Sequence, residues 1–507
     1  MRRRSCLPST RRLWLAHARL ASRLIAAFVA LLAAWSAGEP TAGSRKPSPT
    51  TPLALTPCHV EALAEEILCG IHEVDEDRDA GGKRIPIHVA VLPPLRRSSV
   101  SDPLFILSGG PGQGARSLGA AAARYFRQVR RTRPIVLVDL RGTGASNPLE
   151  CLREQDDMRT LGSGADFYLE GAAACLAEID ADPRHYTHAT ALADLDEVRQ
   201  RLGYGQINLW GGSWGTRAAM LYALSYPQAV RSVVLDGAVS FEDAFPRQVA
   251  RHAQRAMDLL IERCAADAVC ASTFPDPRSE LWSLLTRLER QPITVTIQHP
   301  RTAAPASVTF TRDTVAEIVR VALYTTYDAA RLLQTIRHAV RGDFAPLAAQ
   351  YVHSAATTTD DMALGLTMSI LCSEDLPLVS GADFESDGHG TFVGSSYAEA
   401  WRSRCRQWPA GPPIDVDRHA TSDASALILS GQYDPVTPPA SAAAMGRRFA
   451  NHRHVVVPGA AHNTSFTGCV PDLIAAFLDK GAANLDTACV SAVPLPPIVV
   501  NDAGGRP

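Results

Sequence analysis

A glycine-flanked serine between a strand-like and a helix-like segment constrains the fold of this 507-residue chain more than any other feature. Residues 211–215 have the sequence GGSWG; the apolar run 207–210 precedes them, and residues 216–224 have helical composition. A serine in such a G-x-S-x-G turn has a strained backbone and presents its Oγ above the end of a sheet. Glycines flank it because side chains would collide with the adjoining strand and helix. We therefore predict that Ser213 is a nucleophile.

Short apolar runs alternate with helical stretches along much of the chain. Apolar strands that are separated by helices predict a parallel sheet covered on both faces. Between residues 240 and 423 longer helical patterns replace this alternation, and two strands follow. We predict an α/β core that is interrupted by a mostly helical insertion. The predicted strands are 87–92, 104–107, 135–138, 207–210, 230–235, 426–430 and 454–457.

The amino terminus has the composition of a secretory signal. Arginines at positions 2–4, 11 and 12 precede the apolar run 24–34, and small residues follow as far as Gly38. This run is shorter than the ~18 residues of a membrane-spanning helix, so we expect cleavage near Gly38 and no stable membrane span afterwards. The predicted segments are a signal peptide (1–38), a disordered lead-in (39–57), the first part of the core (58–239), a helical cap (240–423), the last part of the core (424–490) and a tail (491–507).

The cysteines also favour export to a periplasm or the extracellular space. Of eleven cysteines, Cys6 lies in the predicted signal, which leaves ten, and an even number in an exported chain indicates disulfides. No C-x-x-C motif or Cys/His cluster is present, which argues against zinc. The net charge of −2 gives no reason to expect a nucleic-acid partner. We hypothesise that sequential neighbours pair: Cys58–Cys69, Cys151–Cys175, Cys264–Cys270, Cys372–Cys405 and Cys469–Cys489.

Two residues near the carboxyl end complete a catalytic triad with the serine. A serine hydroxyl needs a base to take its proton and an acid to orient that base. Asp434 lies just beyond the carboxyl end of the predicted strand 426–430, and His462 lies in the loop after strand 454–457. Taken singly, the aspartate would be a turn residue and the histidine a surface or core residue. Their order and position after strands predict a Ser213, Asp434, His462 triad.

The tetrahedral intermediate of acyl transfer also needs hydrogen-bond donors for its oxyanion. One predicted donor is the backbone N–H of Trp214, directly after the nucleophile. The second is the N–H of Gly110 in the glycine-rich loop 108–114, since the following Pro111 has no N–H. This loop lacks the spacing of a phosphate-binding turn, so a nucleotide-binding function is not favoured.

Six segments of the chain, which include the nucleophile turn and the glycine-rich loop, together resemble the tripeptidyl-aminopeptidase-like branch of the prolyl aminopeptidases, which are α/β hydrolases. The resemblance implies an α/β-hydrolase fold and a helical cap whose acidic residues bind the free α-amine of a peptide. It assigns that role to Glu374 and Asp375, which could instead cap or solvate a helix end. Ser108 stands where prolyl aminopeptidases often carry histidine, which leaves the specificity open. The matching segments are 109–112, 139–146, 211–216, 194–203, 434–438 and 459–462.

The resulting prediction is an exported serine aminopeptidase that acts on peptides through an acyl-enzyme on Ser213. The chemistry needs no cofactor or metal. A carboxylic-ester hydrolase with the same triad is the first alternative, because acyl chemistry does not reveal the leaving group. A catalytically silent binding module is the second. The sequence predicts neither the number of residues released nor the oligomeric state.

Overall fold

The computed structural model describes residues 51–97, 102–151, 165–298, 303, 305–358, 362–415, 417 and 419–503. The predicted signal peptide (1–38), the lead-in as far as residue 50 and the last four residues of the predicted tail lie outside these ranges. All structural statements below concern the compact unit Pro52–Pro507. In the described part of this unit, no helix has the length and apolar character needed to cross a bilayer.

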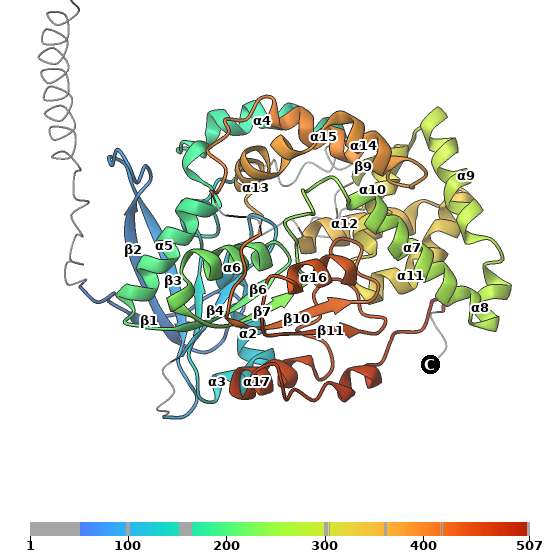
Figure 1. Cartoon of the computed structure of the whole chain (residues 1–507). Helices are drawn as coiled ribbons and strands as arrows, with labels where there is room; N and C mark the ends of the chain where they lie inside the picture. The colour runs from blue at the N-terminus through green and yellow to red at the C-terminus, as the bar shows by residue number, and fades with distance from the viewer. Residues whose placement is uncertain are drawn as a thin grey trace, which may run out of the picture. The chain divides into compact units, whose positions relative to one another are not determined.

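A nine-stranded sheet forms the centre of the unit, in the order β1-β2-β3-β5-β4-β6-β7-β10-β11 (Figure 1). All seven predicted strands are present in it. The prediction of a parallel sheet is wrong for the strand at 87–92, because β3 runs antiparallel to both β2 and β5. From β5 to β11 the sheet is parallel. The strands are β1 (Thr56–Cys58), β2 (Ile67–Asp75), β3 (Arg84–Leu92), β4 (Leu104–Leu107), β5 (Ile135–Val138), β6 (Ile207–Gly212), β7 (Val230–Asp236), β10 (Ser425–Gly431) and β11 (His452–Val457).

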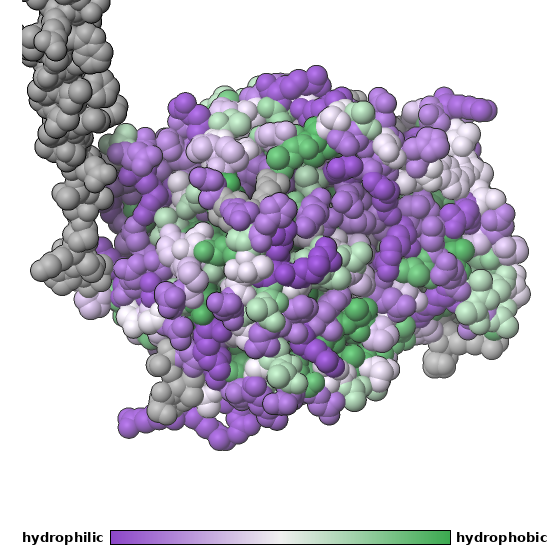
Figure 2. Space-filling model, viewed as in Figure 1, coloured by the Kyte–Doolittle hydropathy of each residue, from purple (hydrophilic) through white to green (hydrophobic). Residues whose placement is uncertain are grey.

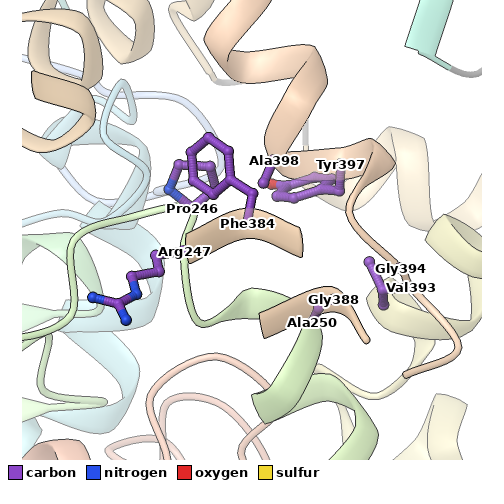
Figure 3. Close-up of a pocket in the computed structure, with 9 residues that line it drawn as sticks. All are labelled: Pro246, Arg247, Ala250, Phe384, Gly388, Val393, Gly394, Tyr397 and Ala398. Carbon is purple, nitrogen blue, oxygen red and sulfur yellow. The ribbon is translucent and has the colours of Figure 1, made fainter. Parts of the chain in front are cut away.

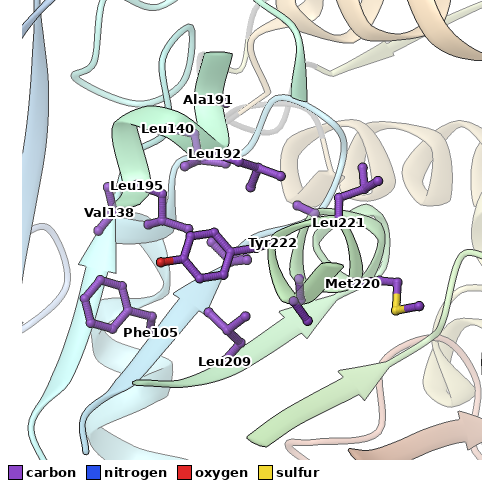
Figure 4. Close-up of a cluster of buried hydrophobic side chains, with 14 of the residues drawn as sticks. Phe105, Val138, Leu140, Ala191, Leu192, Leu195, Leu209, Met220, Leu221 and Tyr222 are labelled. Atoms are coloured by element: carbon purple, nitrogen blue, oxygen red, sulfur yellow. The ribbon is translucent and has the colours of Figure 1, made fainter. Parts of the chain in front are cut away.

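Helices cover both faces of this sheet. Side chains alternate between the faces along a strand: in β4, Phe105 and Leu107 face one apolar cluster, while Leu104 and Ile106 face the other. Figure 4 shows the first cluster, where Leu195 and Tyr222 pack against the sheet. Helices α5 (His188–Arg201), α6 (Trp214–Ser225) and α16 (Pro439–Gly446) cover this face, and α2 (Gly119–Tyr125), α3 (Arg127–Arg130) and α17 (Val470–Lys480) cover the other. Burial on both faces explains why the central strands are almost entirely apolar.

Between β7 and β10 the chain forms a second body of helices with its own apolar cluster. A two-stranded antiparallel sheet, β8 (Ile293–Gln298) with β9 (Pro305–Phe310), also lies here. The sequence prediction missed this hairpin, although β8 alternates half-buried and exposed residues. The helices are α7 (Val249–Ala265), α8 (Ala268–Thr273), α9 (Pro277–Arg290), α10 (Arg312–Ala322), α11 (Thr326–Val340), α12 (Ala345–Thr358), α13 (Leu364–Ile370), α14 (Gly381–Gly388) and α15 (Ser396–Cys405).

One helix from earlier in the chain packs against this region. Helix α4 (Ala165–Glu178) lies beside α15 in Figure 1, and its Ala172 and Cys175 share an apolar cluster with Leu371 and Trp401. The region above the sheet is therefore assembled from two parts of the chain. We use the word cap for α4 together with α7–α15 and the connecting segments.

The five hypothesised cysteine pairs are all disulfides in the structure, which confirms that pairing. Two of them stabilise the cap region next to the site described below. Cys372–Cys405 joins the segment after α13 to α15, and Cys151–Cys175 ties α4 to the loop after β5. The other three are Cys58–Cys69, Cys264–Cys270 and Cys469–Cys489.

Candidate active site

Ser213 occupies a sharp turn between β6 and α6. Its backbone angles are φ 54° and ψ −124°, a conformation that non-glycine residues rarely adopt and that signals a functional constraint. A Cβ on Gly215 would lie 2.2 Å from the carbonyl oxygen of Leu107, so only glycine fits beside β4. The Ser213 N–H donates to the carbonyl of Asp236 (2.8 Å), and Thr216 Oγ1 donates to the Ser213 carbonyl (2.6 Å). These bonds stabilise the strained turn.

Asp434 lies in the loop that follows β10 and is completely buried. Its Oδ1 accepts the backbone N–H groups of Val436 and Thr437 (both 2.8 Å), and its Oδ2 accepts the Thr437 hydroxyl (2.8 Å). Burial alone would raise the pKa of this carboxyl group. The charge and hydrogen bond of His462, together with the two N–H groups, hold the pKa below its ordinary value. Asp434 is therefore an ionised carboxylate with a fixed orientation.

His462 lies in the loop after β11, with its Nδ1 2.8 Å from Asp434 Oδ2. Its backbone N–H donates to the carbonyl of Tyr324 (3.1 Å), and the Tyr324 ring meets the imidazole edge to face at 5.2 Å. Burial alone would lower the pKa of His462, but Asp434, with a smaller contribution from Asp236, raises it above its ordinary value. With Nδ1–H donating to Asp434, the other ring nitrogen, Nε2, can act as a base.

The structure places the predicted serine after β6 and the predicted histidine after β11, at the same edge of the sheet. Both residues lie within the described ranges, and no hydrogen bond joins Ser213 Oγ to the His462 ring. The hydrogen bond between a nucleophile and its base commonly tightens when substrate binds. Between them lie the last residue of β7, Asp236, which accepts the Ser213 N–H, and Gly237. A Cβ on Gly237 would lie 3.1 Å from His462 Cε1. The carboxyl ends of the parallel strands β6, β10 and β11 therefore bring the three predicted triad residues to one edge of the sheet.

The predicted oxyanion loop lies against the nucleophile. A Cβ on Gly109 would come within 3.2 Å of Ser213 Cβ and 3.8 Å of its Oγ. Gly110, with φ +113°, faces Met362, whose methyl group is 2.6 Å from the position of a Cβ on this glycine. The neighbouring cap residue Ala363 contacts the same loop, because its N–H donates to the Gly112 carbonyl (3.1 Å). The cap thus contacts the loop proposed to bind the oxyanion.

The acidic residues Glu374 and Asp375 lie in a single π-helical turn, η4 (Leu371–Asp375), and both are buried. Glu374 Oε1 accepts the backbone N–H of His188 (2.9 Å), and its Oε2 bonds to the ring Nδ1 of the same histidine. Asp375 Oδ1 accepts from Arg217 Nη1 (2.6 Å). Both carboxylates are therefore already paired within the protein, and Glu374 uses both of its oxygens.

His188 and Arg217 are the residues that the sequence prediction missed at this position. The His188 ring stacks on Trp214 with a centroid distance of 4.7 Å, directly beside the nucleophile. Four buried polar atoms of this group have no hydrogen-bond partner among the described residues, and unpaired buried groups are costly. These atoms are His188 Nε2, Trp214 Nε1, Arg217 Nε and Asp375 Oδ2. No pattern in the sequence marks His188, because its pairing with Glu374 joins residues 186 positions apart.

Outside this site, three kinds of feature among the described residues bear on function: metal ligands, pockets and apolar surface patches. No group of three or more His, Cys, Asp or Glu side chains in the described ranges is arranged to hold a metal ion. A small pocket in the cap lies between α7, α14 and α15 and is lined by residues such as Arg247, Phe384 and Tyr397 (Figure 3). None of the predicted site residues lines it. Hydrophilic and apolar residues are interspersed on the face in Figure 2, without a large apolar patch.

A family model described as the alpha/beta hydrolase fold matches residues 102–468. The chain belongs to this family. The match confirms the predicted fold class, with a sheet and helices arranged as described above. It extends from the strand before the glycine-rich loop to just beyond His462, so all the predicted site residues lie inside it.

Sequence relatives of this α/β hydrolase include named peptidases. Serine protease Hip1 of Mycobacterium tuberculosis (strain ATCC 25618 / H37Rv) is 26% identical over 480 residues, which cover 85% of this chain and 89% of Hip1. Proline iminopeptidase of Neisseria gonorrhoeae is 30% identical over 27% of this chain and 32% of its own length. The putative hydrolase YuaR of Escherichia coli (strain K12) is 27% identical over 46% of this chain, which spans only half of YuaR. Among solved structures, proline iminopeptidase from Mycobacterium smegmatis aligns with a TM-score of 0.37 and 16% identity, over 81% of this chain and 93% of its own.

Proposed function

We propose that this α/β hydrolase is an exported serine aminopeptidase that cleaves peptides near their free amino terminus. The observation that carries the proposal is that Ser213, Asp434 and His462 lie at one edge of the sheet. The distance from His462 Nδ1 to Asp434 Oδ2 is 2.8 Å. The peptidase names of several relatives support it. Five disulfides support export, because disulfides persist in oxidising compartments.

The proposed reaction is acyl transfer through the serine. His462 Nε2 takes the hydroxyl proton as Ser213 Oγ attacks the scissile carbonyl carbon, and Asp434 stabilises the imidazolium that forms. The oxyanion accepts hydrogen bonds from the backbone N–H groups of Gly110 and Trp214. The imidazolium then gives its proton to the leaving amine, which departs and leaves an acyl ester on Ser213. A water molecule, deprotonated by His462, hydrolyses this ester and regenerates the enzyme.

The acidic turn beside Trp214 provides a place for the substrate amine. Asp375 Oδ2 is buried and unpaired among the described residues, so it can accept a hydrogen bond from an ammonium group. Burial raises the pKa of Asp375, and a bound cation would favour its ionised form. Glu374 contributes indirectly, because both of its oxygens hold His188. We therefore assign the direct contact with the amine to Asp375, and the orientation of His188 to Glu374.

A panel of reporter substrates tests this function. Peptide arylamides with a free amine, with one to three residues before the arylamide, are compared with their amino-acetylated forms and with simple acyl esters. We expect free-amine peptides to be cleaved at least about tenfold faster than acetylated ones, since a charged hydrogen bond is lost on acetylation. A preference for acyl esters, the alternative that uses the same triad, would overturn the aminopeptidase assignment. Ser213→Ala is the control for contaminating activity.

A further inference from the structure

Asp236, the last residue of β7, is joined to the proposed nucleophile through its backbone. It lies opposite Gly212 of β6 in the sheet register, and its carbonyl accepts the N–H of Ser213 (2.8 Å). On the other side it lies opposite Leu429 of β10, the strand that leads to Asp434. Asp236 is thus central among the strands that carry the proposed triad.

The side chain of the same residue binds the loop that carries His462. Asp236 Oδ1 accepts the N–H (2.8 Å) and the hydroxyl (3.1 Å) of Thr464, and its Oδ2 accepts the N–H of Ser465 (2.6 Å). Asp236, Thr464 and Ser465 are all completely buried. The Ser465 hydroxyl in turn accepts the indole N–H of Trp210 on β6 (2.9 Å). Two backbone amides of the histidine loop therefore depend on one carboxylate.

We propose that Asp236 is a positioning residue for the acyl-transfer reaction: its carbonyl fixes the Ser213 turn while its carboxylate fixes the His462 loop, so that one residue sets the spacing between nucleophile and base. The spacing matters because a misplacement of about 1 Å can cost roughly 100-fold in rate. The carboxylate also contributes negative charge near the imidazolium that forms during the reaction. The inference rests on the proposed function, because it assumes that Ser213 and His462 react.

Several charged and titratable groups surround the imidazole, and Asp236 differs from each of them. Asp434 faces it from the loop after β10 and accepts its Nδ1–H. Tyr324 packs against it from the end of α10, and the buried Arg320 of that helix donates to the Tyr324 hydroxyl (2.9 Å). Arg320 lowers the pKa of His462, whereas Asp434 and Asp236 raise it. Among these groups, Asp236 is distinguished by its backbone carbonyl, which accepts a hydrogen bond from the Ser213 N–H.

The substitution Asp236→Asn tests this inference. An asparagine amide keeps the size of the side chain but turns one acceptor into a donor, so it cannot accept both loop N–H groups. We expect kcat on a free-amine peptide arylamide to fall about 100-fold with little change in KM. The acid limb of the kcat/KM profile should also move to lower pH, because a negative charge near His462 is removed. Thermal unfolding of each variant reports the folded fraction.

The matched control is Asp194→Asn. Asp194 is an equally buried carboxylate in α5, but it accepts hydrogen bonds from Arg141 and Arg78 instead of from the His462 loop. This variant should lose stability while the folded fraction keeps the wild-type kcat and acid limb. If both variants lose activity only in proportion to the unfolded fraction, Asp236 is merely structural and the inference is wrong.

Two further variants separate the possible failures. If Asp236→Asn does not fold, Thr464→Val removes only the hydroxyl donor; a several-fold loss of kcat at constant KM would support the inference, and a wild-type kcat would overturn it. Full activity in Ser213→Ala would overturn the proposed function together with the inference. Activity that is lost in Ser213→Ala but retained in Asp236→Asn would overturn the inference alone.

Discussion

Two buried acid–histidine pairs contrast with each other: one lies within the core, and the other joins the core helix α5 to the cap. In the core pair, Asp434 binds His462 Nδ1 in loops that follow adjacent parallel strands. In the cap-side pair, Glu374 binds both the ring Nδ1 and the backbone N–H of His188, which stacks on Trp214. The chemical groups are nearly the same, so the difference in proposed role depends on placement. An acid–histidine pair alone therefore does not identify a catalytic base.

The largest difference in activity is expected between alanine substitutions of the two histidines. We expect His462→Ala to lower kcat about 10⁶-fold, because loss of the general base costs about as much as loss of the whole triad. His188→Ala should lower kcat/KM only about 10- to 100-fold on free-amine peptides, the effect of losing a hydrogen bond to a charged group. Steady-state kinetics on the arylamide panel measures both. Equal losses in the two variants would contradict the division of roles.

The two acids provide the next comparison. Asp434→Asn should lower kcat about 10⁴-fold, because an amide favours the wrong tautomer of His462. Glu374→Gln should leave kcat on a simple ester almost unchanged and act mainly on free-amine peptides. Ester and peptide turnover by the same preparations distinguishes the two outcomes. A loss of ester turnover in Glu374→Gln comparable with that in Asp434→Asn would mean that the cap-side pair takes part in acyl transfer.

A smaller effect concerns the carboxylate assigned to the substrate amine. Asp375→Asn should reduce kcat/KM for free-amine peptides by about 10- to 100-fold and leave amino-acetylated peptides unaffected. The loss should fall mainly on KM if the contact is equally strong in the ground state and the transition state. Because Arg217 loses its charged partner in this variant, thermal unfolding must be measured in parallel. An equal loss on both substrate classes would exclude a specific amine contact.

The smallest effect is a shift of the pH profile. His462 must be neutral to accept the Ser213 proton, and its pKa is raised above its ordinary value, chiefly by Asp434 against the effect of burial. Activity should therefore be lost as the pH falls through this raised pKa, with an acid-limb midpoint above about 6.5. The kcat/KM profile of the wild-type enzyme gives this midpoint. A midpoint below the ordinary histidine value would show that burial dominates over Asp434.

The core could be predicted from the sequence because its signals are local. Apolar runs predicted seven of the nine strands of the main sheet, and the GGSWG turn predicted the strained backbone at Ser213, since both depend on neighbouring residues. Strand direction is not local: nothing in the run 87–92 indicates that β3 pairs antiparallel with β5. The cap-side site was harder to predict from the sequence because its contacts are also not local. Glu374 and Asp375 stood out as an acidic pair, but their partners His188 and Arg217 are more than 150 positions away in the chain.

Covalent labelling of the nucleophile tests the central claim most directly. The purified protein is treated with a serine-reactive fluorophosphonate, digested and mapped by mass spectrometry, with Ser213→Ala as the control. We predict one stoichiometric adduct on the peptide that contains Ser213, parallel loss of aminopeptidase activity, and protection by a free-amine peptide substrate. An adduct on another residue, or full aminopeptidase activity after complete labelling of Ser213, would contradict the account.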